Sequence, residues 1–245
     1  MSLKFYNLAT APLHETTLLN LIESTWSRMI LSSPVLKNYW KKLYDYFPQY
    51  QLFLKEDHAI IAYASTIPFY WDQPLDELPE EGWDWLLEQG VKNYEAGVSP
   101  NYLGGLLIGV DHAHRGKSLS RLMIQQAKEK VVTDNFKNLI IPIRPTLKDQ
   151  HPAIPMKEYI NWKKDGQIFD PWIRRHVNSG ASIIKVCEAS MRIEASMQDW
   201  ESWTGKVIRE AGEYSVEGAL SLVKFSPKEN LGRYEEPNVW IYYPR

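Results

Sequence analysis

The most constraining feature of this 245-residue chain is an apolar strand that runs through a short turn directly into a helix. Residues 106–110 are aliphatic or glycine, which is typical of a buried strand, and residues 118–131 carry apolar side chains at helical spacing. The turn between them holds Arg115, Gly116 and Lys117. Strands that alternate with helices in this way are typical of α/β proteins, so this segment predicts that class.

The start of this helix has the features of an anion-binding site. The backbone N–H groups of a first helical turn have no partner inside the helix, and the helix dipole adds partial positive charge. Arg115 and Lys117 add two full charges, and Ser118 or Ser120 can cap the helix. A capped helix with basic residues in solvent fits the same pattern. The spacing therefore leaves phosphate binding and a purely structural turn both open.

The rest of the chain predicts further helices and strands around this segment. Apolar residues at helical spacing indicate two N-terminal helices, within 18–30 and 35–47, and two strands follow at 50–54 and 60–69. Further helices are expected at 83–94, 156–164, 171–179 and around Trp200, and further strands at 139–143, 182–186, 191–195 and 239–243. We expect a mixed central sheet flanked by helices, and no composition shift marks a domain boundary.

Composition excludes several classes of protein. The chain has 28 Lys plus Arg against 30 Asp plus Glu, so it lacks the basic excess that neutralises nucleic-acid phosphates. Its 10 Trp and 14 Tyr argue against disorder. No apolar run approaches the roughly 20 residues of a membrane span, and the first residues lack the apolar core of a signal peptide. We expect a cytoplasmic protein with no nucleic-acid or membrane partner.

Residues 115–120, Arg-Gly-Lys-Ser-Leu-Ser, resemble the acyl-CoA-binding signature of the GNAT acyltransferases. That signature has Arg or Gln, two residues, Gly, one residue, and then Gly or Ala. Ser118 and Ser120 stand where the family has small residues, and Ser118 is the larger departure because Gly adopts positive φ more easily than Ser. The predicted element order resembles the family over residues 1–195. Residues 196–245 are then expected to be a C-terminal extension packed on the same domain.

The resemblance implies a specific reaction and a specific cleft. The chain would be an N-acyltransferase that moves an acetyl group from acetyl-CoA, its co-substrate, to a primary amine of a small molecule or peptide by direct attack in a ternary complex. Acetyl-CoA would lie between two diverging parallel strands, 106–110 and 139–143. The residues implied to bind the pantetheine arm and the pyrophosphate are Ile108, Val110, Arg115, Gly116, Lys117, Ser118, Leu119 and Ser120.

The same resemblance points to candidate catalytic residues. The reaction needs a base for the ammonium form of the acceptor and an acid for the leaving thiolate. His176 stands where the family carries Tyr, and an imidazole titrates near neutral pH. Asp111, at the end of the first cleft strand, is a candidate base. The alternatives are a surface His beside Arg174 and Arg175, and an ordinary loop Asp.

Four further residues are candidates to bind the acceptor. Arg144 follows the second cleft strand and could hold an acceptor carboxylate or the pantetheine through its guanidinium, or else form a surface ion pair. The chain has no Trp or Tyr between Leu103 and Glu158, so the surplus of rings lies outside the segment assigned to CoA. Some rings could line a pocket for an apolar or aromatic amine, while most fill the core. The candidates are Tyr70, Trp71 and Tyr159, and Trp162 and Trp172 belong to the same surplus of rings.

Other kinds of protein remain open from the sequence. Ser118, Ser120 and the missing Tyr also suit a non-catalytic domain that binds acyl-CoA as a sensor, and exposed rings suit an interaction protein. No metal site is predicted, because His112 and His114 have no third ligand nearby. Cys187 lies in a strand-like run and is expected to be a buried, inert thiol. A homodimer is left open.

Overall fold

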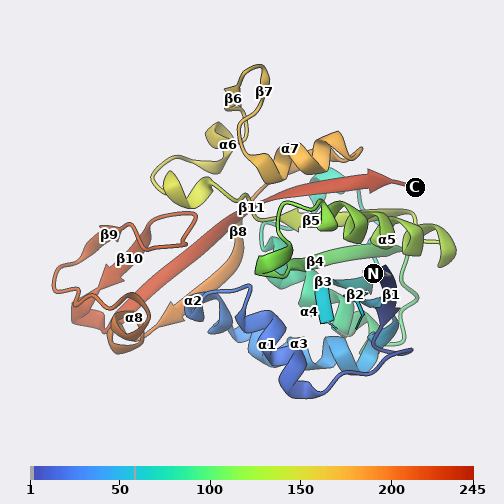
Figure 1. Cartoon of the computed structure of the whole chain (residues 1–245). Helices are drawn as coiled ribbons and strands as arrows, with labels where there is room; N and C mark the ends of the chain where they lie inside the picture. The colour runs from blue at the N-terminus through green and yellow to red at the C-terminus, as the bar shows by residue number, and fades with distance from the viewer. Residues whose placement is uncertain (1–2, 58) are drawn as a thin grey trace.

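A computed structural model describes residues 3–57 and 59–245 (Figure 1). The helices are α1 (Glu15–Glu23), α2 (Arg28–Leu31), α3 (Pro34–Tyr46), α4 (Gly82–Glu95), α5 (Leu119–Thr133), α6 (Met156–Tyr159), α7 (Pro171–Asn178) and α8 (Met197–Thr204). The strands are β1 (Leu3–Asn7), β2 (Gln51–Glu56), β3 (Ala59–Phe69), β4 (Tyr102–Val110), β5 (Asn138–Ile143), β6 (Lys163–Lys164), β7 (Gln167–Ile168), β8 (Ser182–Ala195), β9 (Gly212–Tyr214), β10 (Val223–Ser226) and β11 (Leu231–Pro244).

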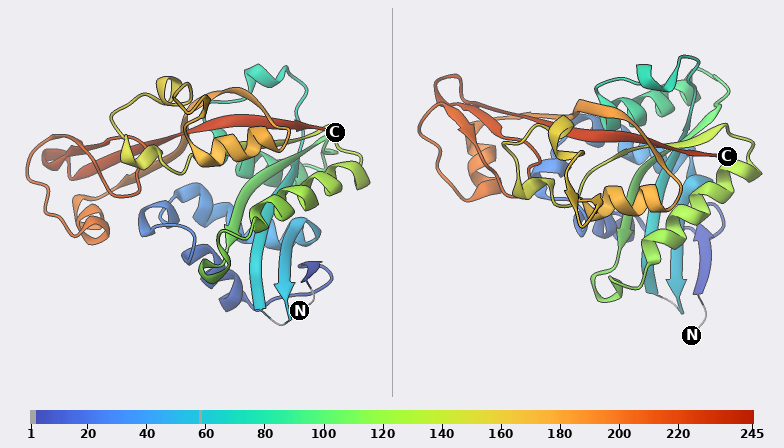
Figure 2. Two further views of the ribbon diagram at one scale, coloured as in Figure 1. Left: turned by 45° about the horizontal axis from the view of Figure 1, so that its top comes forward. Right: turned by 90° about the horizontal axis from the view of Figure 1, so that it is seen from above.

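One mixed sheet connects most of the strands. Its order is β1-β2-β3-β4-β5-β11-β10-β9, β8 pairs with β11, and β6 and β7 form a separate hairpin. Strands β1 to β4 run antiparallel, whereas β4 and β5 are parallel. The long strand β11 crosses much of the molecule beside β5 and β8 (Figure 2). The predicted α/β class and the mixed, helix-flanked sheet are therefore confirmed.

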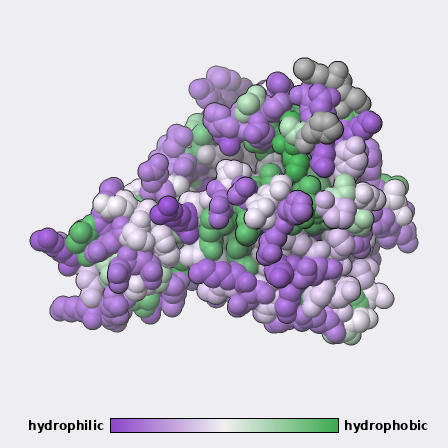
Figure 3. Space-filling view, turned by 60° about the horizontal axis from the view of Figure 1, so that its bottom comes forward, coloured by the Kyte–Doolittle hydropathy of each residue, from purple (hydrophilic) through white to green (hydrophobic). Residues whose placement is uncertain are grey.

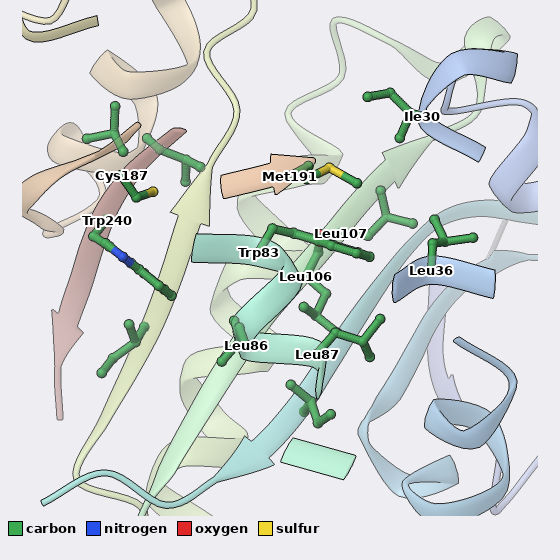
Figure 4. Packing of buried hydrophobic residues seen from close by; sticks show 14 of the residues in the cluster. Ile30, Leu36, Trp83, Leu86, Leu87, Leu106, Leu107, Cys187, Met191 and Trp240 are labelled. Carbon is green, nitrogen blue, oxygen red and sulfur yellow. The ribbon is translucent and has the colours of Figure 1, made fainter. Parts of the chain in front are cut away.

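Helices cover both faces of the sheet because successive strand residues point to opposite sides. On one face, Leu119 and Met123 of α5 pack against Ala62 and Ala64 of β3. On the other face, a larger core includes α3 and α4, and Leu86 and Leu87 of α4 lie fully buried there. Figure 4 shows these two leucines beside Trp83, Leu106 and Leu107.

The N-terminal region differs from the expectation in two ways. The helix expected within 18–30 is divided into α1 and α2, because the Ser27 side chain accepts a hydrogen bond from the Ile30 N–H and starts a new helix. The break leaves residues 24–27 outside both helices. Strand β1 was not predicted, and it pairs with β2 at the edge of the sheet.

Three expectations in the second half of the chain are corrected. The helix expected at 156–164 ends at Tyr159, and a hairpin with Asp165 and Gly166 at positive φ follows. The two strands expected at 182–186 and 191–195 form the single strand β8, which bulges opposite Pro237. The final strand begins at residue 231 rather than 239, and β9 and β10 were not predicted.

Residues after 195 are integral to the sheet. Strand β11 pairs with β5 from Val239 to Pro244 and with β8 along most of its length. Trp200, Phe225 and Trp240 from this region are fully buried. In the described residues, no helix has both the length and the apolar character needed to cross a membrane.

Candidate functional site

A cavity of about 670 Å³ lies where β4 and β5 separate. These strands pair only through Leu103 with Leu139 and Gly104 with Ile140. Farther along, residues 105–110 of β4 and 141–143 of β5 line opposite sides of the cavity. Beyond Gly104, the edge of β4 that faces β5 therefore has no strand partner among the described residues. On the face drawn in Figure 3, hydrophobic residues lie in recessed positions among hydrophilic ones.

The turn before α5 presents a run of free backbone donors at the cavity. Within the part of the chain that the structure describes, the N–H groups of residues 116–120 donate no hydrogen bond. Gly116 has φ +82° and Ser118 has φ +57°, so both adopt the left-handed region that favours glycine. Ser118 occupies the N-cap position, but its side chain makes no capping hydrogen bond. Arg115 and Ser120 line the cavity next to these donors.

His176 is buried and lies on the cavity wall, so the surface alternative is wrong. Its Nδ1 lies 2.8 Å from the Tyr243 hydroxyl, and its Nε2 has no hydrogen-bond partner among the described residues. Burial, with a smaller contribution from Arg175, lowers the pKa of His176 to about 3. The imidazole is therefore neutral at physiological pH, with one ring nitrogen free.

Asp111 is exposed and does not line the cavity. Its carboxylate accepts hydrogen bonds from His114 Nδ1 at 2.7 Å and from the Ala113 N–H at 3.0 Å. The hydrogen bond from His114 is the main reason that the pKa of Asp111 lies below its ordinary value. His114 Nε2 also lies 3.4 Å from Glu56, so the histidine links the motif turn to β2.

Arg144 lies on the cavity wall and pairs with the fully buried Glu236 rather than with a surface carboxylate. Its Nε donates to both carboxylate oxygens of Glu236, at 3.1 and 3.0 Å, and its Nη2 donates to the Gly218 carbonyl. Its Nη1 makes no hydrogen bond within residues 3–57 and 59–245, and 35% of the side chain remains exposed. Arg144 therefore keeps guanidinium donors available at the cavity.

Glu236 was missed by sequence reasoning, because it lies in the part of β11 that was not predicted. It is fully buried and lines the cavity. Besides the Arg144 pair, its oxygens accept from the Tyr234 hydroxyl at 2.9 Å and from Asn238 Nδ2 at 3.2 Å. Asn238 Oδ1 in turn accepts from the Ser190 hydroxyl at 2.6 Å. The carboxylate thus has hydrogen-bond donors on both oxygens and serves to hold Arg144 in place.

Of the rings singled out from the sequence, Trp172 lines the cavity, and Trp26 and Trp83 line it as well. The structure does not bring Tyr159 to this cavity: it is buried, and its hydroxyl donates to Asp170. Tyr70 and Trp71 also lie outside the lining, at the start of the segment that connects β3 to α4. The sequence predicts Trp26 as part of one continuous helix. Its position between α1 and α2, on the cavity wall, results from the break between these helices.

The remaining predictions concern His112, His114 and Cys187. Among the described residues, no group of three or more His, Cys, Asp or Glu side chains could hold a metal ion. Cys187 is fully buried, and this burial raises the pKa of its thiol to about 12. A thiol of this kind stays protonated, as expected for an inert side chain.

The comparison with known proteins assigns the family. No family model matches the sequence. The chain is 33% identical over 252 residues to a protein named arginine N-acetyltransferase avaD from Aspergillus versicolor. This alignment covers 91% of this chain and 86% of that protein. The chain belongs to the GNAT acyltransferases. The predicted membership of this family is thereby confirmed, and the protein is an acyltransferase.

Solved GNAT structures share the fold at low sequence identity. The loading GNATL domain of CurA from Lyngbya majuscula superimposes with a TM-score of 0.62 at 14% identity, covering 100% of this chain and 98% of that domain. The GNAT-like decarboxylase GphF, solved in complex with isobutyryl-CoA, gives a TM-score of 0.58 at 12% identity, covering 100% and 99%. Both cover residues 196–245, so this GNAT fold includes the C-terminal strands.

Proposed function

We propose that this GNAT enzyme transfers the acetyl group of acetyl-CoA to the α-amine of an amino acid, with arginine as the first acceptor to test. The observation that carries the proposal is the run of free N–H groups at 116–120, which opens onto the cavity between β4 and β5. Such donors at a helix N-terminus suit a pyrophosphate. The name of the relative from Aspergillus versicolor supports arginine as the acceptor.

The unpartnered edge of β4 suits the pantetheine arm. Backbone groups near Ile108 and Val110 face the gap left by β5, and an extended chain with amide groups can pair with such an edge as an added strand. Arg115, at the turn end of the cavity, would add a charge-assisted contact to the phosphates. The thioester would then lie between the two strands and point toward the Arg144 and His176 side.

The chemistry requires attack of a neutral amine on the thioester carbonyl. The C–N bond forms and the C–S bond breaks, and the proton that the amine nitrogen loses ends on the departing sulfur, so the products are the amide and the free thiol of CoA. If the Tyr243 hydroxyl donates to Nδ1 of His176, its Nε2 carries a hydrogen and can donate to the departing thiolate. A neutral imidazole in this role is a hydrogen-bond donor rather than a proton source. Asp111 lies outside the cavity lining, so the proposal gives it no contact with the amine.

The acceptor carboxylate would bind Arg144. Its Nη1 donors are free among the described residues, and Glu236 together with Gly218 fixes the plane of the guanidinium. A planar guanidinium held in this way matches the two oxygens of a carboxylate. This contact would orient the α-amine, so amines without a neighbouring carboxylate should be poorer acceptors.

Calorimetric titration with acetyl-CoA and thiol-release assays test the proposal. We expect acetyl-CoA to bind below millimolar and thiol release to depend on arginine. Arg115→Ala should weaken acetyl-CoA binding by about tenfold, as for loss of a charge-assisted hydrogen bond, while Arg121→Ala, an exposed arginine on α5, should not. His176→Ala should lower turnover with little effect on acetyl-CoA affinity. Binding without release for any amine would instead indicate a sensor.

A further inference from the structure

Two tryptophans form a fixed corner of the cavity, away from the motif turn. We call Trp26 and Trp83 the tryptophan corner: their ring centroids are 5.5 Å apart and their planes meet at 88°. Trp40 supports both, with centroids 5.2 Å from Trp26 and 5.9 Å from Trp83. Trp83 is almost fully buried and Trp26 is partly exposed, and both line the cavity.

The corner is held in place by hydrogen bonds on both sides. The Trp83 indole N–H donates to the Leu106 carbonyl at 2.8 Å, and Figure 4 shows its ring beside Leu106. On the Trp26 side, the hydroxyl of Tyr63 contacts the Leu21 carbonyl and the Thr25 hydroxyl, which fixes the loop between α1 and α2. Rigid rings lose little conformational entropy when a ligand packs on them.

The cavity offers a cation few other partners. Among the described residues that line it, Glu236 is the only carboxylate. Arg144, Tyr234 and Asn238 already donate to its two oxygens. A positively charged group that enters the cavity would therefore meet the tryptophan rings, with Thr25 and Ser27 beside them, rather than a free carboxylate.

We propose that the tryptophan corner binds the guanidinium of the acceptor side chain and makes the enzyme select arginine over neutral analogues. The inference rests on the proposed function and assigns the specificity of that same site. A guanidinium is planar, weakly hydrated and suited to stacking on tryptophan faces, whereas an ammonium keeps its water more strongly. Because a guanidinium stays protonated, the α-amine is the group that becomes a nucleophile.

The test compares arginine with citrulline, whose urea group has nearly the same shape and no charge. Wild-type kcat/KM should favour arginine. Trp26→Leu should reduce that ratio by roughly 2- to 30-fold, the range expected for a cation–π contact, and Trp26→Phe should keep part of it. Trp71→Leu, which removes a tryptophan outside the cavity lining, is the matched control and should keep the wild-type ratio.

Two results would overturn the inference. One is equal use of citrulline and arginine by the wild-type enzyme, which needs no variant. The other is an unchanged ratio in an active Trp26→Leu or, if that protein fails to fold, in Trp26→Phe. Failure of the proposed function looks different, because thiol release would then be absent with arginine and citrulline alike.

Discussion

Asp84 provides a test of how the fold treats a buried carboxyl group. It lies in the first turn of α4, and only 8% of its surface is exposed. Its Oδ2 accepts from the Arg192 N–H at 3.0 Å, and its Oδ1 has no partner among the described residues. Burial raises the pKa of Asp84 from 3.8 to about 7, and the negative charge of Glu236 adds to the effect.

The raised pKa predicts the sign and size of a pH effect on stability. The folded protein holds a proton on Asp84 that the unfolded chain loses near pH 4, so this group contributes stability at low pH. The contribution is lost as pH rises through the folded pKa of about 7. Since each pKa unit corresponds to about 1.4 kcal/mol, the total is about 4 kcal/mol, of which about 3 kcal/mol falls between pH 4.5 and 8.

Asp84→Asn keeps the shape of the side chain and removes its titration. We expect the free energy of unfolding in urea, measured for wild type minus variant, to fall by about 3 kcal/mol between pH 4.5 and 8. Titrations shared by both proteins cancel in this difference. Asp76→Asn, which removes a carboxyl at an exposed site, is the control. A difference for Asp84→Asn that is no steeper with pH than the difference for Asp76→Asn would refute the argument from burial.

Three further predictions follow from the site. Gly109→Ala would place a Cβ 2.3 Å from the Tyr63 ring, so we expect it to lower the free energy of unfolding by about 1–3 kcal/mol. An unchanged melting temperature would contradict this close contact. Ser118 has a left-handed backbone conformation that costs roughly 1–2 kcal/mol for a residue with a Cβ. Ser118→Gly should therefore keep or raise the urea midpoint and keep the affinity for CoA. A lower midpoint together with weaker CoA binding would argue against the turn geometry. With its pKa lowered to about 3, His176 should give no inflection near pH 6.5 in kcat, and an inflection there that His176→Gln abolishes would show that the imidazole titrates in that range.

The parts of the fold that sequence predicts well are local. Residues 106–131 carry their own periodicity and turn chemistry, so the strand, the turn and the helix all appear where expected. The sequence predicts two strands in place of β8, because the alternation of its side chains is interrupted at a bulge opposite Pro237. The break between α1 and α2 depends on a serine cap inside a continuous apolar pattern, which periodicity alone does not reveal.

The cavity wall was only partly predictable, since its contacts join distant parts of the chain. Arg144 and His176 could be noticed from their positions after a strand and within a helix. The partner of Arg144 is Glu236, 92 residues away, and no local pattern links the two. Trp26 looked like an ordinary core residue of a helix. The neutral state of His176 also depends on distant residues, because Tyr243 and the surrounding core bury the imidazole and this burial lowers its pKa.

The pairing of β5 with β11 has a consequence for how the protein is made. Strand β5 is synthesised well before β11, and the contact between Arg144 and Glu236 spans 92 residues. At about 5–20 residues per second, ribosomes need roughly 5–20 s to add that length. During this interval the apolar edge of β5 has no strand to pair with, and an unpaired edge invites association with other chains. We therefore expect a higher level of chaperones to raise the yield of folded protein in cells, even if the folded protein itself is stable.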